Sequence, residues 1–139
     1  MTTAKIQYQN NLRTCSTHLK SNDKIVTDAP IDNHGRGEAF SPTDLLASSL
    51  ASCMMTLMGI HAQNNGIRFE NAEAEMEKIM TDNPRRVAEI KININIEDAD
   101  LTPEQKHILE SAALNCPVAK SLHPEIKQNI KFIYTKNKS

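Results

Sequence analysis

Hydrophobic and polar residues alternate along much of the chain, a pattern that predicts β-strands around one long apolar segment. The clearest strand extends from about Val87 to Glu97. A period of two places its apolar side chains on one face, which we expect to pack on a helix while the other face meets water. The apolar set is Ala88, Ile90, Ile92, Ile94 and Ile96.

Weaker strand patterns lie on both sides of this segment. Residues Ile67–Met80 precede it across an Asp82-Asn83-Pro84 turn, which predicts a long hairpin. Three short segments near the N-terminus predict a small antiparallel meander: Lys5–Tyr8, Leu12–Leu19 and Lys24–Thr27. A loop is expected to follow over Pro30–Ala39, and a last strand is predicted near the C-terminus over Ile126–Thr135.

The long apolar segment predicts a buried helix from about Pro42 to Asn64. Ser41 is suited to the N-cap, Pro42 to the first helical position, and Asp44 completes a capping box. At the other end, Gly66 can adopt the left-handed conformation that terminates a helix. Apolar residues cover nearly the whole circumference of this helix, and a helix of that kind is buried.

The same helix is long enough to cross a membrane. Polar and charged residues within it argue against that interpretation, as does the lack of flanking charges. These residues are Asp44, Ser48, Ser49, Ser52 and His61. We therefore expect no membrane partner.

Two further helices complete the predicted order of elements. The sequence Thr102-Pro103-Glu104-Gln105 is a second capping box with proline at the first helical position. A short third helix is predicted to start near Cys116-Pro117. The resulting order, β-β-β-α-β-β-α-α-β with hairpins between strands, predicts an α+β fold with largely antiparallel sheets.

Composition and charge exclude several classes of function. The chain has 139 residues, and we expect a single domain over residues 1–139. Its 16 Lys and Arg nearly balance its 17 Asp and Glu, so the charge gives no indication of nucleic acid or an anionic membrane as a partner. Three cysteines and no apolar signal core at the N-terminus predict a cytoplasmic protein with reduced thiols.

The three cysteines have different sequence environments. Cys116 directly precedes a predicted helix, where free backbone N–H groups are expected to lower the pKa of a thiol. Cys53 lies in the middle of the long helix without a charged residue at helical contact spacing, so it is either a small buried hydrophobe or a thiol activated by another part of the fold. Cys15 lies in a strand rich in Ser and Thr and gives no indication of a function.

Other catalytic and metal-binding motifs are missing from the sequence. The five histidines and three cysteines form no C-x-x-C, H-x-x-x-H or H-E-x-x-H spacing. There is also no G-x-S-x-G element and no phosphate-binding P-loop. We therefore expect neither a metal nor a cofactor.

Two cysteine-containing segments together resemble a known family. The segment Phe40–Cys53 (FSPTDLLASSLASC) is similar to the first motif of the osmotically inducible protein C and organic hydroperoxide resistance (OsmC/Ohr) superfamily, in which a proline-led helix start precedes small residues and a cysteine. Asn115–Leu122 (NCPVAKSL) resembles the second motif, a Cys-Pro at a helix start. The element order also matches, so the resemblance covers essentially the whole chain.

This resemblance implies both a fold and a chemistry. The expected fold is an intertwined homodimer with antiparallel sheets around a long central helix and two active sites at the subunit interface. The expected activity is reduction of organic hydroperoxides, with Cys53 as the peroxidatic thiol, Cys116 as the resolving thiol and an external dithiol as reductant. An apolar pocket beside Cys53, lined by residues such as Met54 and Leu57 or by the partner subunit, would suit the organic part of the substrate.

One departure from the family pattern leaves open which arginine acts at the site and whether the protein is an enzyme. Hydroperoxide-resistance members have Glu directly after the helix-start proline, paired with an arginine from an early strand, whereas this chain has Thr43 there and resembles the general OsmC-like branch. Arg13 is the expected match for the arginine, with Arg36 as a competing candidate, and Asp44 is expected to cap the helix. The alternative function is a non-enzymatic dimer that binds a small apolar ligand or senses redox state.

Overall fold

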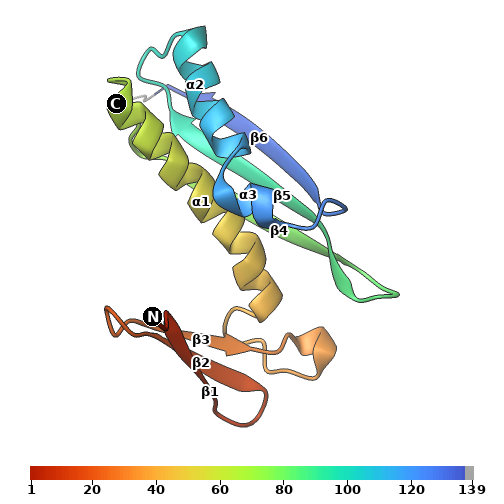
Figure 1. The fold of residues 1–139 in the computed structure, drawn as a ribbon. Coiled ribbons are helices and arrows are strands. Elements are labelled where there is room, and N and C mark those ends of the chain that lie inside the picture. Colours follow the sequence, from red (N-terminus) through yellow and green to blue (C-terminus); the bar gives the residue numbers. More distant parts are fainter. Residues whose placement is uncertain (137–139) are drawn as a thin grey trace. The chain divides into compact units, whose positions relative to one another are not determined.

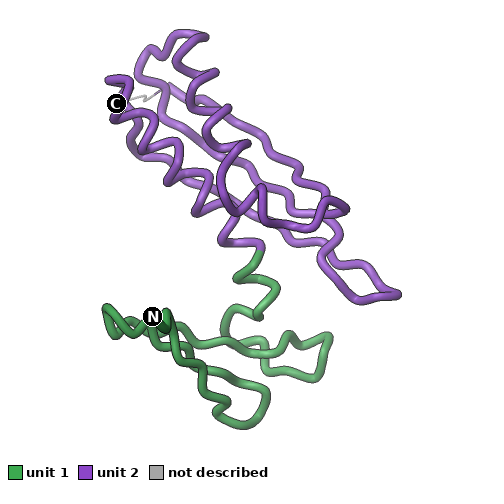
Figure 2. Tube along the Cα trace, viewed as in Figure 1, with its two compact units in different colours: residues 1–46 green, residues 47–139 purple. Residues whose placement is uncertain are grey.

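The computed structural model describes residues 1–136, and its element order is close to the predicted one (Figure 1). The strands are β1 (Ala4–Tyr8), β2 (Arg13–His18), β3 (Lys24–Asp28), β4 (Glu73–Thr81), β5 (Arg86–Glu97) and β6 (Lys127–Thr135). The helices are α1 (Pro42–Asn64), α2 (Pro103–Leu114) and α3 (Pro117–Ser121), with one 3₁₀ turn at Ile31–Asn33. Contacts divide the chain into two compact units, residues 1–46 and residues 47–139 (Figure 2).

The first unit contains the predicted antiparallel meander. Its three strands pair in the order β1-β2-β3, and the β2–β3 register sets Arg13 opposite Asp28. The loop after β3 folds back on itself, since the backbone N–H of Gly35 donates to the carbonyl oxygen of Pro30 at 2.9 Å. A Cβ atom at Gly35 would lie 1.7 Å from the carbonyl oxygen of Ala29, so only glycine fits this approach.

The second unit contains a mixed sheet, in which the pairing of β6 departs from the predicted antiparallel arrangement. Strands β4 and β5 form the predicted antiparallel hairpin, whereas β6 lies parallel to β5. Helices α2 and α3 lie between these strands in the sequence and supply the long crossover that a parallel pair requires. Strand β4 also begins later than the predicted Ile67, because Asn71 adopts a left-handed conformation with φ of 53° and interrupts the extended chain.

One face of the sheet in the second unit packs against the helices. Ile90, Ile92, Ile94 and Ile96 on the inner face of β5 are completely buried, as the alternating pattern predicts, and this face packs on α1 and α2 (Figure 1). The expectation for Ala88 is wrong: Ala88 is only partly buried and Val87 is buried instead, because the register with β4 shifts between Ile79 and Met80. The outer face bears the polar residues of the same strand. The core of this unit is built mainly from Leu50, Met54, Met58, Ile90, Ile92, Ile94, Ile96, Leu109 and Ala113.

Helix α1 is buried on one face only, although its apolar residues cover nearly its whole circumference. Its buried residues recur every three or four positions, from Ala47 to Ala62. On other faces, Leu46 and Ile60 remain 42% and 45% exposed. The prediction of a helix buried all round therefore does not hold within one chain.

Helix α1 has the length and hydropathy of a membrane-spanning helix, a test that the core helix of a soluble protein also passes. Its Leu50, Met54 and Met58 are completely buried in the core with β5 and α2.

Candidate functional site

The structure brings Cys53 and Cys116 into contact. Cys53 projects from the middle of α1 and is half-buried, whereas Cys116 is the N-cap of α3 and is completely buried. Cys53 is close enough to influence the Cys116 thiol, and both thiols are free rather than joined in a disulfide. Both belong to the second unit, so their contact depends on the packing of α1 against the α2–α3 crossover.

The environment of Cys116 corrects one expectation from the sequence. The backbone N–H of Ala119 does donate to the Cys116 Sγ at 3.4 Å, as a helix N-terminus allows. Burial is the larger influence, however, and together with the contact to Cys53 it raises the pKa of the Cys116 thiol above its ordinary value. Helix α3 has only 5 residues, and its N-terminus does not offset the loss of water.

An open groove of about 320 Å³ lies between α1 and α2. Its lining includes Leu57, one helical turn after Cys53, and Asn115, the neighbour of Cys116 in the sequence. The other lining residues are His61, His107, Ile108, Ser111 and Ala112. Met54 does not line this groove because it is completely buried in the core, so the predicted apolar pocket is only partly matched by Leu57.

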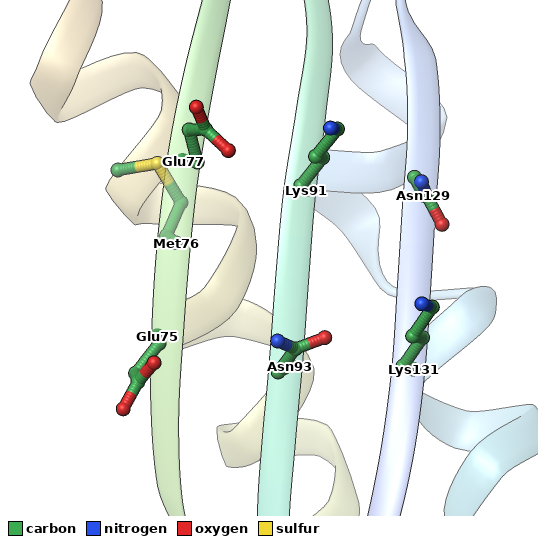
Figure 3. Close-up of a pocket in the computed structure, with 7 residues that line it drawn as sticks. All are labelled: Glu75, Met76, Glu77, Lys91, Asn93, Asn129 and Lys131. Carbon is green, nitrogen blue, oxygen red and sulfur yellow. The ribbon is translucent and has the colours of Figure 1, made fainter.

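A second cavity, of about 310 Å³, lies on the sheet of the second unit and is lined by polar side chains (Figure 3). Its Lys91 and Asn93 alternate along β5 with the buried Ile92 and Ile94, which places the cavity on the outer face, away from the core that contains Cys116. Its residues include no cysteine and are Glu75, Met76, Glu77, Lys91, Asn93, Asn129 and Lys131.

Arg13 makes a two-pronged ion pair that the sequence did not predict. Its Nε and Nη2 atoms donate to the two carboxylate oxygens of Asp28 at 2.7 and 2.8 Å. The Asp28 side chain is 1% exposed, and the guanidinium beside it lowers the pKa of that carboxyl below its ordinary value. Arg36, the competing candidate, lies in the exposed loop and adds only a weaker charge interaction with Asp28.

The start of α1 has the predicted capping box. The backbone N–H of Asp44 donates to the Ser41 Oγ at 3.0 Å, and the backbone N–H of Ser41 donates to the Asp44 Oδ2 at 2.9 Å. The hydroxyl groups of Thr43 and Ser41 lie 3.2 Å apart. This geometry confirms the role of Asp44 as a helix cap and gives Thr43 a place in the same hydrogen-bonded turn.

The remaining cysteine lies apart from the pair in the sequence and in its contacts. Cys15 is buried in β2 of the first unit, paired in register with Gln7 and Val26. Within residues 1–136 we find no group of three or more His, Cys, Asp or Glu side chains that could hold a metal ion.

Comparison with known proteins places these features in a family. The family model of OsmC-like proteins matches residues 35–131, which include both cysteines of the pair. A Psychrobacter arcticus structure, described as an osmotic stress induced and detoxification response protein, is 52% identical, covers 95% of this chain and 96% of its own, and has a TM-score of 0.90. No curated protein matches the chain.

More distant structures share the fold. The organic hydroperoxide resistance protein OsmC of Legionella pneumophila is 18% identical with a TM-score of 0.72, and the alignment covers 96% of each chain. The organic hydroperoxide resistance protein OhrB of Bacillus subtilis is also 18% identical, with a TM-score of 0.61, covering 94% of this chain and 98% of its own. The family model and the 52% identical structure together establish that the chain belongs to the OsmC-like protein family.

Proposed function

We propose that this protein is a thiol-dependent peroxidase that reduces organic hydroperoxides. The observation that carries the proposal is the contact between two free thiols, Cys53 and Cys116, on the α1 and α3 helices of one chain. Two structures of the same fold are named organic hydroperoxide resistance proteins, which supports the same class of substrate.

The chemistry needs two thiols with different roles. The Cys53 thiolate attacks the peroxide oxygen, the O–O bond breaks, and the alcohol leaves after taking up a proton, so that Cys53 becomes a sulfenic acid. The Cys116 sulfur then attacks the Cys53 sulfur and water leaves, which forms a disulfide. An external dithiol restores both thiols by two exchange steps and is itself oxidised to a disulfide.

The burial of the two cysteines suits this division of roles. Cys53 is half-buried and so is open to a substrate, whereas Cys116 is completely buried. Because burial raises the pKa of Cys116, this thiol stays protonated at neutral pH and does not compete for the peroxide. The groove that begins at Leu57 offers Ile108 and Ala112 as apolar walls for the organic part of the substrate.

Arg13 is the residue that we propose to stabilise the thiolate. A guanidinium is always charged and donates several hydrogen bonds, so it favours an anionic sulfur over a neutral one. Arg13 uses Nε and Nη2 in its carboxylate contacts, and Nη1 takes part in none of them.

We also propose that the working unit is an intertwined homodimer built from one domain over residues 1–139, acting in the cytoplasm. Ile60 on α1 is 45% exposed, and Ile6, Tyr8 and Ile25 on one face of the first sheet are 61%, 62% and 49% exposed. A second copy of the chain would remove this apolar surface from water, at roughly 25 cal/mol for each Å² buried.

The dimer gives a prediction with a matched control. Ile60→Glu should raise the dimer dissociation constant by about tenfold or more, because a charge would be buried without a partner at the interface. Ile133, which is 39% exposed on the outer face of β6, offers the control Ile133→Glu, which should leave the constant unchanged. Sedimentation velocity over a range of concentrations measures both. Equal weakening by the two variants, or a monomeric unmodified protein, would contradict the dimer.

Titration of thiols tests the peroxidase proposal itself. One equivalent of cumene hydroperoxide should remove two thiols per chain and form a disulfide between Cys53 and Cys116, which peptide mapping under non-reducing conditions identifies. Cys15 should remain a thiol because it is buried in another unit. Retention of all three thiols with several organic hydroperoxides and hydrogen peroxide would reject the proposal.

One observation favours the alternative function, a dimer that binds a small apolar ligand or senses redox state. The helix start has Thr43 within its hydrogen-bonded turn, where the resemblance leads us to expect a glutamate. An apolar ligand that copurifies with the protein and is retained by Cys53→Ser would favour this function, provided that the thiol titration is negative.

A further inference from the structure

The outer face of the sheet in the second unit carries charges that are separated by strand. Its glutamates Glu75 and Glu77 both lie on β4, whereas Lys91 lies on β5 and Lys131 on β6 (Figure 3). All four side chains are exposed and border the polar cavity of about 310 Å³ described above. The cavity therefore has an acidic side and a basic side, and its charges balance.

The register of the strands explains this separation. Glu77 is paired with Lys91 on β5, and Lys91 is paired in turn with Asn129 on β6. The neighbouring row begins at Glu75 on β4 and ends at Lys131 on β6. Residues two apart on a strand share a face, so the two rows lie side by side on the outer face. Each row has its acid at the β4 end and its lysine farther across the sheet.

The charged groups around the cavity are not used within the chain. Opposite charges directly across an antiparallel pair can form an ion pair, yet the Glu77 and Lys91 side chains form none within residues 1–136. In the same part of the chain, the side chains of Glu75, Asn93 and Lys131 make no hydrogen bond or ion pair. Their donors and acceptors are therefore available to a ligand.

The other two residues that line the cavity are already engaged. The Asn129 Nδ2 donates to the Glu89 Oε2 at 3.2 Å. Met76 is paired in register with Ile92 and packs against the core on the inner face. The groups left for a ligand are thus two carboxylates, two ammonium groups and the amide of Asn93.

We propose that this cavity binds a small zwitterion, with its ammonium group at Glu75 and Glu77 and its carboxylate at Lys91 and Lys131. Neighbouring strands lie about 4.8 Å apart, so β4 and a line midway between β5 and β6 are separated by about 7 Å. A dipeptide spans at most about 7 Å, whereas a single amino acid spans about half of that. The ligand class is therefore a dipeptide with free ends.

The balance of charges selects a ligand that carries both signs. A simple anion drawn to the two lysines would be repelled by the two glutamates, and a simple cation would meet the reverse. A dipeptide gains at both ends, and the Asn93 amide between them can donate to its peptide carbonyl. The cavity lies on the opposite face of the sheet from the core that contains Cys116, so its ligand is independent of the peroxidase chemistry.

Titration with alanylalanine tests the site, with the backbone amide NMR shifts of β4, β5 and β6 as the readout. We expect saturable shifts around the cavity. N-acetyl-alanylalanine and alanylalanine amide each lack one charge and should bind about fivefold more weakly. No saturable shift at about 50 mM alanylalanine, equal affinities for the three peptides, or tighter binding of inorganic phosphate at the same amides would overturn the proposal.

Two pairs of variants test the two ends of the ligand. Lys131→Gln should weaken alanylalanine binding by about fivefold, whereas Lys127→Gln, on the same face of β6 but outside the cavity, should leave it unchanged. Glu77→Gln should weaken binding by a similar factor, with Glu73→Gln on β4 as its control. All four side chains are exposed, so these variants should keep the fold.

The pattern across the peptides separates direct contact from a general change of surface charge. Lys131→Gln should not weaken alanylalanine amide further, because that peptide has no carboxylate to lose. By the same reasoning, Glu77→Gln should not weaken N-acetyl-alanylalanine further. Equal losses in the cavity variants and their controls, or the same loss for all three peptides, would contradict the assigned orientation and overturn the proposal.

Discussion

Cys53→Ser should abolish hydroperoxide consumption, with a loss of at least about a thousandfold, because a serine hydroxyl stays protonated at neutral pH and is a poor nucleophile toward peroxide. The substitution keeps the shape of the side chain and removes only its sulfur chemistry. Cys53 is half-buried, so we expect little change in the free energy of unfolding. Peroxide consumption is measured with a ferric dye assay under excess dithiol.

The chain supplies its own control for this variant. Cys15→Ser makes the same chemical change at a buried cysteine of the first unit, outside the contact between Cys53 and Cys116. We expect it to consume hydroperoxide at the normal rate. Residual activity of Cys53→Ser above a few per cent, or equal losses in both variants, would exclude Cys53 as the peroxidatic thiol.

Cys116→Ser should separate the first chemical step from turnover. The first equivalent of hydroperoxide should still be reduced at nearly the normal rate, because Cys53 is unchanged. Further turnover should fall by about a hundredfold with a bulky dithiol reductant, because a neighbouring thiol acts at an effective concentration that an external one does not reach. The sulfenic acid on Cys53 should then accumulate and be trapped by dimedone, which mass spectrometry detects.

The raised pKa of Cys116 adds a pH dependence to the resolving step. The thiolate is the reactive form, so at neutral pH only a small fraction of Cys116 reacts. In the unmodified protein, disulfide formation after a single addition of peroxide should accelerate as the pH rises toward the pKa of Cys116. Normal multiple turnover by Cys116→Ser, or a disulfide step that slows with rising pH, would contradict its resolving role.

Much of the local structure could be predicted from the sequence, because short-range interactions decide it. The capping boxes at Ser41–Asp44 and Thr102–Gln105 form as expected, since each links backbone and side-chain atoms within one helical turn. The alternation of isoleucines along β5 likewise determined which face is buried.

The parallel pairing of β6 could not be predicted from the same patterns. An alternating strand fits either direction of pairing, and the choice depends on where the α2–α3 crossover delivers the chain. The burial of α1 could also be predicted only in part. Its composition indicates apolar surroundings on all sides, but residues such as Ile60 remain exposed in one chain and need another surface to cover them.

The candidate site shows the same division. Cys53, Cys116 and Arg13 were singled out through the resemblance of two sequence segments to the OsmC/Ohr superfamily, with Arg36 as a competing candidate. Only the tertiary structure decided that the two thiols touch, that burial raises the pKa of Cys116, and that Asp28 holds Arg13. The physical reason is range: caps and periodicity act between near neighbours, whereas contact, burial and ion pairing depend on segments that are distant in the chain and meet only when it folds.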